Sequence, residues 1–81
     1  MRDEAIASQV RRIVAEVFSL PLDTVTLQSS HETTEGWDSI GQLNLIIALE
    51  QEFHVQFSLD DIENMVDVRG IIHAVDGRGM Q

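Results

Sequence analysis

The sequence contains no cysteine, no lysine and no tyrosine, and it has only one proline among its 81 residues. Without cysteine the chain can form no disulfide, no thiolate metal site and no thiol nucleophile of its own. It has no apolar run long enough to cross a membrane, and its first residues lack the hydrophobic stretch of a signal peptide. We therefore expect a cytoplasmic protein that does not bind membranes.

Positive charge is also scarce. The formal net charge is −9, and no lysine or arginine stands between Arg12 and Arg69. A strongly acidic surface repels nucleic acids and anionic membranes and attracts basic protein surfaces. A simpler interpretation, equally open at this point, is that the acidity only keeps the protein soluble.

The length allows one small domain, and a domain of this size buries roughly 60% of the surface that its unfolded chain exposes. Hydrophobic spacing predicts four helices, no strand pairing and a long loop between the first two helices. The first helix should stop before Pro21, since the residue before proline is disfavoured in the α region. The first helix should span Asp3–Ser19, and the second should start at Asp38 or Ser39 and end at Phe53. The third should span Leu59–Met65, and the fourth should follow Asp67 and end at Gly77. The prediction is an all-α four-helix bundle filling 1–81, with a short third helix and 77–81 as a frayed tail.

The second helix has two apolar stripes. One stripe holds Leu45, Ile46, Leu49 and Phe53, and the other holds Ile40, Leu43 and Ile47. One core needs only one stripe, so the second is either buried by another element or exposed for a partner. We favour a docking face, with packing against the long loop as the alternative. A loop as long as the one from Pro21 to Trp37 is usually functional or mobile. The alternative is a surface connection that Leu27 pins over the core.

The segment Gly36-Trp37-Asp38-Ser39-Ile40 places a hydroxyl at the start of this second helix. Either Asp38 or Ser39 could cap the helix, and Ser39 with Gln42 has the spacing of a capping box. Taken alone, a capping serine without chemistry is the commoner explanation. Its position near mid-chain, after a long polar loop and before an apolar helix, favours a functional serine.

The run from Gly36 to Phe57, with the acidic-Phe pair Glu52-Phe53, resembles the acyl carrier protein family. The third and fourth helices follow at matching spacings, so the resemblance covers nearly the whole chain. It implies a carrier, not an enzyme, that holds acyl groups as thioesters on a 4′-phosphopantetheine arm attached to Ser39. A phosphopantetheinyl transferase would transfer this arm from coenzyme A. Asp38 would support the site by capping the helix, with or without a second role near the transferase's metal.

The implied partners are this transferase and the acyl-loading and acyl-processing enzymes, with no nucleic acid and no membrane, and the protein should be a monomer. The expected partner-binding residues lie on the second and third helices: Ile40, Leu43, Ile47, Asp60, Asp61, Ile62 and Glu63. Trp37 either anchors the loop or forms a wall beside the arm.

The sequence departs from the familiar fatty-acid carriers, because Gly41, Asn44 and Gln51 stand where acids are expected. This difference favours a specialised pathway, such as polyketide or related acyl biosynthesis, with fatty-acid biosynthesis still open. The chain length favours a stand-alone carrier over a module of a large synthase. An excised domain of a larger synthase would look the same. The alternatives are a peptidyl or aminoacyl carrier and an arm-less helical adaptor with the same fold.

Other chemistries have less support. No histidine stands within the serine motif to act as a base, although a catalytic set could still be assembled in three dimensions. His31, His54 and His73 lack metal-ligand spacing, and the acids at 60, 61 and 63 lack the alternating ligands and the glycine of a calcium loop. We expect no catalytic residue and no metal site.

Overall fold

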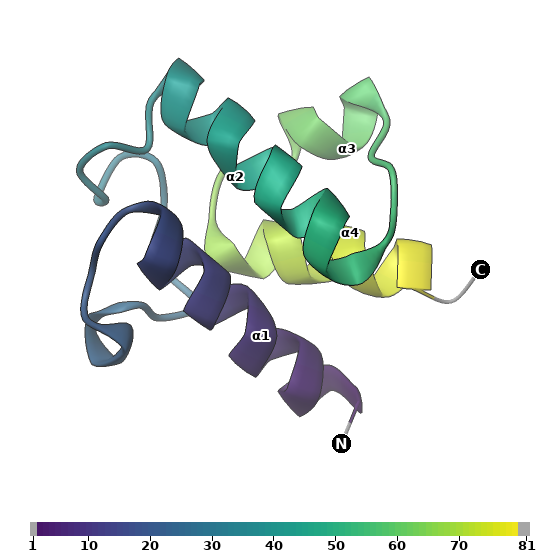
Figure 1. Ribbon diagram of the computed structural model, residues 1–81, viewed down its shortest axis with the longest axis horizontal. Helices are drawn as coiled ribbons and strands as arrows, with labels where there is room; N and C mark the ends of the chain where they lie inside the picture. Colours follow the sequence, from purple (N-terminus) through teal and green to yellow (C-terminus); the bar gives the residue numbers. More distant parts are fainter. Residues whose placement is uncertain (1, 80–81) are drawn as a thin grey trace.

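The predicted all-α fold is confirmed in the computed structural model, which describes residues 2–79 and the side chains of residues 5–77. The elements are α1 (Arg2–Val17), a 3-10 turn η1 (Leu22–Thr24), α2 (Ser39–Phe53), α3 (Leu59–Glu63) and α4 (Val68–Gly79). Figure 1 shows α1 crossing below α2 and α4, with the short α3 beyond them. The start of α1 and the end of α4 both lie away from the end of the molecule where α2 begins (Figure 1).

The core is formed by the apolar faces that the sequence predicted. α1 lies against both α2 and α4, and their facing side chains are buried. The buried predicted residues are Val10, Ile13, Val14, Leu45, Ile46, Leu49, Met65, Val68, Ile71 and Val75. Phe53 and Ile62 are partly buried at the edge of this core.

The first helix ends at Val17, two residues before the predicted end at Ser19. Ser19 adopts a left-handed conformation with φ of 56°. Its amide N–H donates to the Glu16 carbonyl at 3.4 Å, and that of Leu20 donates to the Ala15 carbonyl at 2.8 Å. These are the hydrogen bonds of a Schellman cap, which satisfies the carbonyls of the last turn. The helix is therefore capped before Pro21 can interrupt it.

The alternative in which Leu27 pins the long loop over the core is wrong, because 40% of the surface of Leu27 is exposed. Val25 is the fully buried anchor. The guanidinium of Arg11 donates from Nε to the Val25 carbonyl at 2.8 Å and holds the loop against α1. Sequence spacing alone could not separate these two apolar residues of one loop.

Further along, the loop is fastened to the segment before α4. The amide of His31 donates to the Val66 carbonyl at 3.0 Å, and the amide of Val68 donates to the Ser29 carbonyl at 2.9 Å. Together they form an isolated antiparallel bridge between Ser30 and Asp67, which the sequence did not indicate. The loop that leads to Ser39 is thus fixed at two places.

The link after α2 is held by an acid of that helix. His54 is left-handed, with φ of 56°, and ends the helix after Phe53 as predicted. The Glu50 carboxylate accepts a hydrogen bond from the Phe57 amide at 3.0 Å. One of the two acids on α2 therefore stabilises the fold.

The fourth helix extends beyond its predicted end. Gly77 was expected to terminate it, but α4 continues to Gly79. A terminating glycine takes a positive φ, and Gly77 is not among the glycines that do so. Residues 77–79 of the expected frayed tail are therefore helical, and residues 80 and 81 lie outside the described residues.

Candidate functional site

Asp38, not Ser39, caps α2. Asp38 has extended backbone angles, and its Oδ1 accepts a hydrogen bond from the Gly41 amide at 2.9 Å. The capping box that the spacing of Ser39 and Gln42 suggested is wrong, because the Gln42 side chain hydrogen-bonds to Trp37, Ile62 and Met65 instead. Ser39 is the first residue of the helix, is exposed, and has no side-chain hydrogen bond within residues 5–77. Its hydroxyl is therefore available for chemistry.

The first turn of α2 presents free amide groups near this hydroxyl. The Asp38 side chain accepts a hydrogen bond from the Gly41 amide, and the Asp38 carbonyl accepts one from the Gln42 amide. The amides of Ser39 and Ile40 have no acceptor within residues 2–79. Free N–H groups at a helix start carry partial positive charge and favour an anion. An anionic group attached to Ser39 Oγ would lie beside these donors.

Two glycines allow the loop to cross this turn. Gly36 has a φ of 90°, a left-handed value that favours glycine. A Cβ at buried Gly41 would collide with the Gly36 carbonyl and would lie 2.9 Å from the Phe18 ring. An acidic side chain at position 41 is therefore excluded by packing, which explains one departure from the expected acidic pattern.

Trp37 anchors the loop beneath the start of α2. Only 3% of its surface is exposed, and its ring stacks on Phe18 with the centroids 5.4 Å apart. The indole Nε1 donates to the side-chain oxygen of Gln42 at 2.6 Å. The burial of Trp37 thus supports its predicted role as an anchor of the loop. The ring also lines a cleft.

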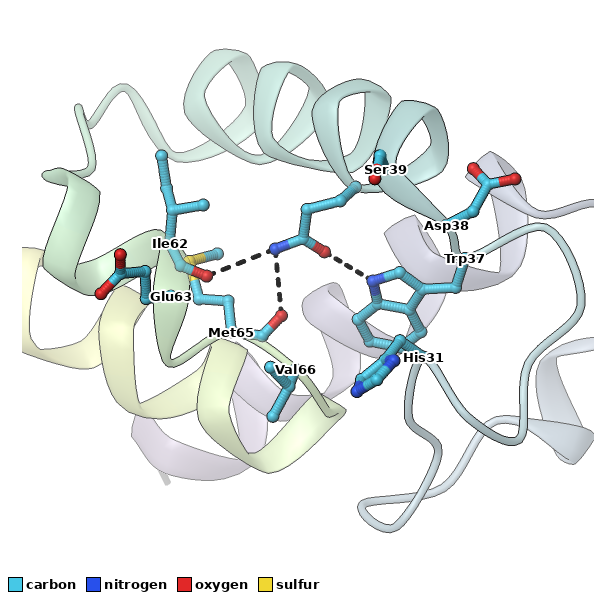
Figure 2. Close-up of a pocket in the computed structure, with 9 residues that line it drawn as sticks. His31, Trp37, Asp38, Ser39, Ile62, Glu63, Met65 and Val66 are labelled. Carbon is cyan, nitrogen blue, oxygen red and sulfur yellow. Dashed lines mark hydrogen bonds between the residues drawn. The ribbon is translucent and has the colours of Figure 1, made fainter.

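That cleft has a volume of about 430 Å³ and lies between the start of α2, the loop and the end of α3. Asp38 and Ser39 stand at the α2 side, and Ile62, Glu63, Met65 and Val66 stand at the other (Figure 2). Most of its lining is apolar. Ser39 is one of the residues that line it.

Gln42 joins the two sides of the cleft. Its Nε2 donates to the Met65 carbonyl at 3.1 Å and to the Ile62 carbonyl at 3.4 Å, while its Oε1 accepts from Trp37. Dashed lines in Figure 2 mark these hydrogen bonds. No local sequence pattern indicates this role, since residues 42 and 65 are far apart in the chain.

The second apolar stripe of α2 is exposed. Ile40, Leu43 and Ile47 are 73%, 59% and 45% exposed, so the alternative of packing against the loop is excluded for the fold described. On α3, Asp60 and Glu63 are exposed and Ile62 lines the cleft.

Asp61 is engaged in the fold. Its carboxylate accepts from the Ser58 amide at 3.0 Å, and its own amide donates to Ser58 Oγ at 3.1 Å. This capping box begins α3. A residue expected to contact partners therefore also stabilises the short helix.

Histidines and acids do not gather into a second site. Within the described residues no group of three or more histidine, aspartate or glutamate side chains could hold a metal ion. His31 lines the cleft with Ser39, but no hydrogen bond joins their side chains within residues 5–77. No helix in the described part of the chain is long and apolar enough to span a membrane.

Known proteins show similarity over the same region. Residues 8–75 match the family described as phosphopantetheine attachment site. The chain is 31% identical over 72 residues to an acyl carrier protein of Campylobacter jejuni subsp. doylei, covering 89% of this chain and 94% of that protein. It is 24% identical over 76 residues to acyl carrier protein 3 of Ralstonia nicotianae, covering 94% and 87% respectively.

A solved structure shows the same fold. The solution NMR structure of a holo acyl carrier protein from Geobacter metallireducens superposes with a TM-score of 0.79 at 25% identity. The match covers 89% of this chain and 83% of that one.

Proposed function

Because this chain belongs to the acyl carrier protein family, we propose that Ser39 is the residue to which its 4′-phosphopantetheine arm is attached. The observation that carries this proposal is an exposed serine hydroxyl at the start of α2, free of hydrogen bonds within residues 5–77. The arm supplies the thiol that the sequence lacks, and this thiol holds an acyl group as a thioester.

The residues at the start of α2 fit a phosphodiester. Attachment joins Ser39 Oγ to the phosphorus of the arm and breaks the bond between the two phosphates of coenzyme A. Adenosine 3′,5′-bisphosphate leaves, and the transferase accepts the hydroxyl proton. The free amides of Ser39 and Ile40 favour the resulting anion by about 0.3–1 kcal/mol, the usual effect of a helix N-terminus. Asp38 holds the first turn in place without occupying the hydroxyl of Ser39. Its second proposed role is a contact near the metal of the transferase.

We propose that partner enzymes dock on the exposed stripe of α2, formed by Ile40, Leu43 and Ile47. Large exposed apolar side chains grouped on one helix are typical of interaction surfaces. Asp60 and Glu63 add negative charge on α3, and Asp61 and Ile62 support that helix and the cleft. The partners would be the transferase and the acyl-loading and acyl-processing enzymes, and these enzymes would perform the chemical steps.

Intact mass spectrometry tests the attachment residue. Treatment with coenzyme A and a broad-specificity phosphopantetheinyl transferase should add one phosphopantetheine to the wild type and none to Ser39→Ala. Ser58→Ala is the matched control, because Ser58 is also an exposed serine at a helix start. It should be modified like the wild type. Modification of Ser39→Ala, or none of the wild type with several transferases, would contradict the proposal and favour an arm-less adaptor.

A further inference from the structure

Two polar side chains of α2 hold the two ends of the segment that contains α3. Near the start of that segment, the Glu50 carboxylate accepts a hydrogen bond from the Phe57 amide at 3.0 Å. At its end, Nε2 of Gln42 donates to the Met65 carbonyl at 3.1 Å. Trp37 donates to Oε1 of Gln42 at 2.6 Å, so this carboxamide forms a bridge between the loop, α2 and the end of α3. Because both ends of the amide are engaged, its partners fix its orientation.

Burial contributes little to the attachment of α3. The helix has five residues, and none of them is buried. Leu59 is 71% exposed, and Ile62 is only partly buried. A helix this short is marginal in water without support from the rest of the fold. The capping box of Ser58 and Asp61 stabilises the helix from within. The hydrogen bonds from α2 therefore help to determine where the end of α3 lies.

Glu63 stands between the two residues whose carbonyls accept from Gln42. These are Ile62, at 3.4 Å, and Met65, at 3.1 Å. The Glu63 side chain is exposed and lines the same cleft as Ser39, on the opposite side (Figure 2). The bridge thus holds the backbone on both sides of an acidic side chain across the cleft from the serine.

Ser39 and Gln42 share one face of α2. Residues three apart on a helix are neighbours, separated by about 4.5 Å along its axis. Because the helix fixes this separation, the hydrogen bonds of Gln42 relate the position of α3 to that of the serine. The attraction between opposite charges falls with distance. A basic group of an enzyme that binds at Ser39 is therefore attracted most strongly to Glu63 when α3 is correctly placed.

We infer that Gln42 is a positioning residue: it sets the place of Glu63 relative to Ser39, and the transferase recognises this acid with a basic side chain. This inference rests on the proposed attachment of the arm to Ser39. Loss of the bridge should weaken binding of the transferase. It should leave the chemical step unchanged, because the Ser39 hydroxyl and the Asp38 cap are untouched. The KM for this protein should therefore rise at constant kcat.

Transferase kinetics with coenzyme A test this inference. The kcat and KM are measured for the wild type, Gln42→Leu and Gln42→Met, each with and without Glu63→Gln. Gln51→Leu is the matched control, since it makes the same change at an exposed glutamine of α2. Glu35→Gln is the matched acid, because Glu35 is exposed in the loop and lies outside α3. The Tm of each variant shows whether it is folded at the assay temperature.

In the wild type and in Gln51→Leu, Glu63→Gln should raise KM with kcat unchanged. Gln42→Leu and Gln42→Met should also raise KM. In these two variants the further rise caused by Glu63→Gln should be smaller by a factor of about two or more, as for residues coupled in one network. Glu35→Gln should change KM by the same factor with and without the Gln42 substitution.

An equal effect of Glu63→Gln in the wild type and in the Gln42 variants would overturn the inference, as would no effect of Glu63→Gln on the wild type. Coupling of Gln42 to Glu35 as strong as its coupling to Glu63 would also overturn it, since the bridge would then act on the whole fold. If Gln42→Leu does not fold, Gln42→Met decides. Failure to load the wild type would instead contradict attachment at Ser39.

Discussion

Gly41 shows how one residue determines the geometry at the start of α2. The loop carbonyl of Gly36 and the ring of Phe18 occupy the space that a side chain at position 41 would need. The missing acid at this position therefore reflects packing and carries no information about the charge of a partner. The same close approach fixes the segment that carries Asp38 and Ser39.

Gly41→Ala should destabilise the protein. The added methyl would gain up to about 1 kcal/mol in helix propensity, but overpacking against a backbone carbonyl costs about 1–3 kcal/mol. Gly77→Ala is the control, because a Cβ there meets nothing within 4 Å in a helical segment. It should stabilise by up to about 1 kcal/mol. Denaturant unfolding measures the change in the free energy of unfolding for each variant. A stabilised Gly41→Ala would show that the loop at Gly36 moves freely away from the added methyl group.

Individual residues also mark the limit of prediction from sequence. Helix starts favour both aspartate and serine, so spacing left Asp38 and Ser39 undecided until the contact with Gly41 was known. The bridge made by Gln42 depends on groups from three parts of the chain, and no local pattern encodes it. Burial of Val25 and exposure of Leu27 likewise depend on where Arg11 places the loop.

Among the elements, α2 has two apolar faces that serve different purposes. Leu45, Ile46 and Leu49 are buried, whereas the stripe of Ile40, Leu43 and Ile47 is exposed. This division was predictable, because helical periodicity separates the two stripes in angle. Which stripe enters the core follows from its larger number of apolar residues.

Leu49→Ala should cost roughly 2–5 kcal/mol, the usual range for a buried leucine. Ile47→Ala should cost much less, since 45% of its surface is already exposed, but it should raise the KM of the transferase for this protein. Denaturant melts and transferase kinetics make the comparison. Equal free-energy losses at the two positions would refute the division into core and docking faces.

Helix ends were predictable where a local signal decides them. Ser58 caps α3 through a capping box, and α1 ends before Pro21. The start of α2 was predictable only to within Asp38 and Ser39. Gly77 misled the prediction, because glycine permits a helix end but does not impose one. Its backbone stays helical, and α4 continues.

The whole molecule carries a net charge of −9. Within the described side chains, Arg12 and Glu52 form an ion pair at 3.7 Å, and both are about half exposed. Such a pair contributes little in water. The sequence has 14 acids and five arginines, so most of the acids cannot have an arginine of their own, and their mutual repulsion disfavours the compact state.

Added salt should raise the Tm, because screening shortens the reach of this repulsion to about 10 Å at 0.1 M. For a domain of this size, relief of about 1 kcal/mol raises the Tm by about 4–8 °C. Divalent cations should act at lower concentration. A melt series in sodium and magnesium chloride measures the effect, and a Tm that falls with salt would mean that the acids are compensated within the fold.

Binding of the transferase should respond to salt in the opposite direction. If a basic surface meets Asp60 and Glu63, the Kd should rise with ionic strength. Titration over the same salt series gives this slope. A Kd independent of salt would assign recognition to the apolar stripe of α2 instead.

The start of α1 and the end of α4 lie away from the end of the molecule where α2 begins (Figure 1). A handle fused to either end, or a bead or sensor chip that holds the protein by it, would therefore leave Ser39 pointing outward. Immobilised protein oriented in this way should accept its arm as readily as the free protein. The same orientation makes either end a suitable attachment point for measuring the rates at which successive enzymes bind at Ser39.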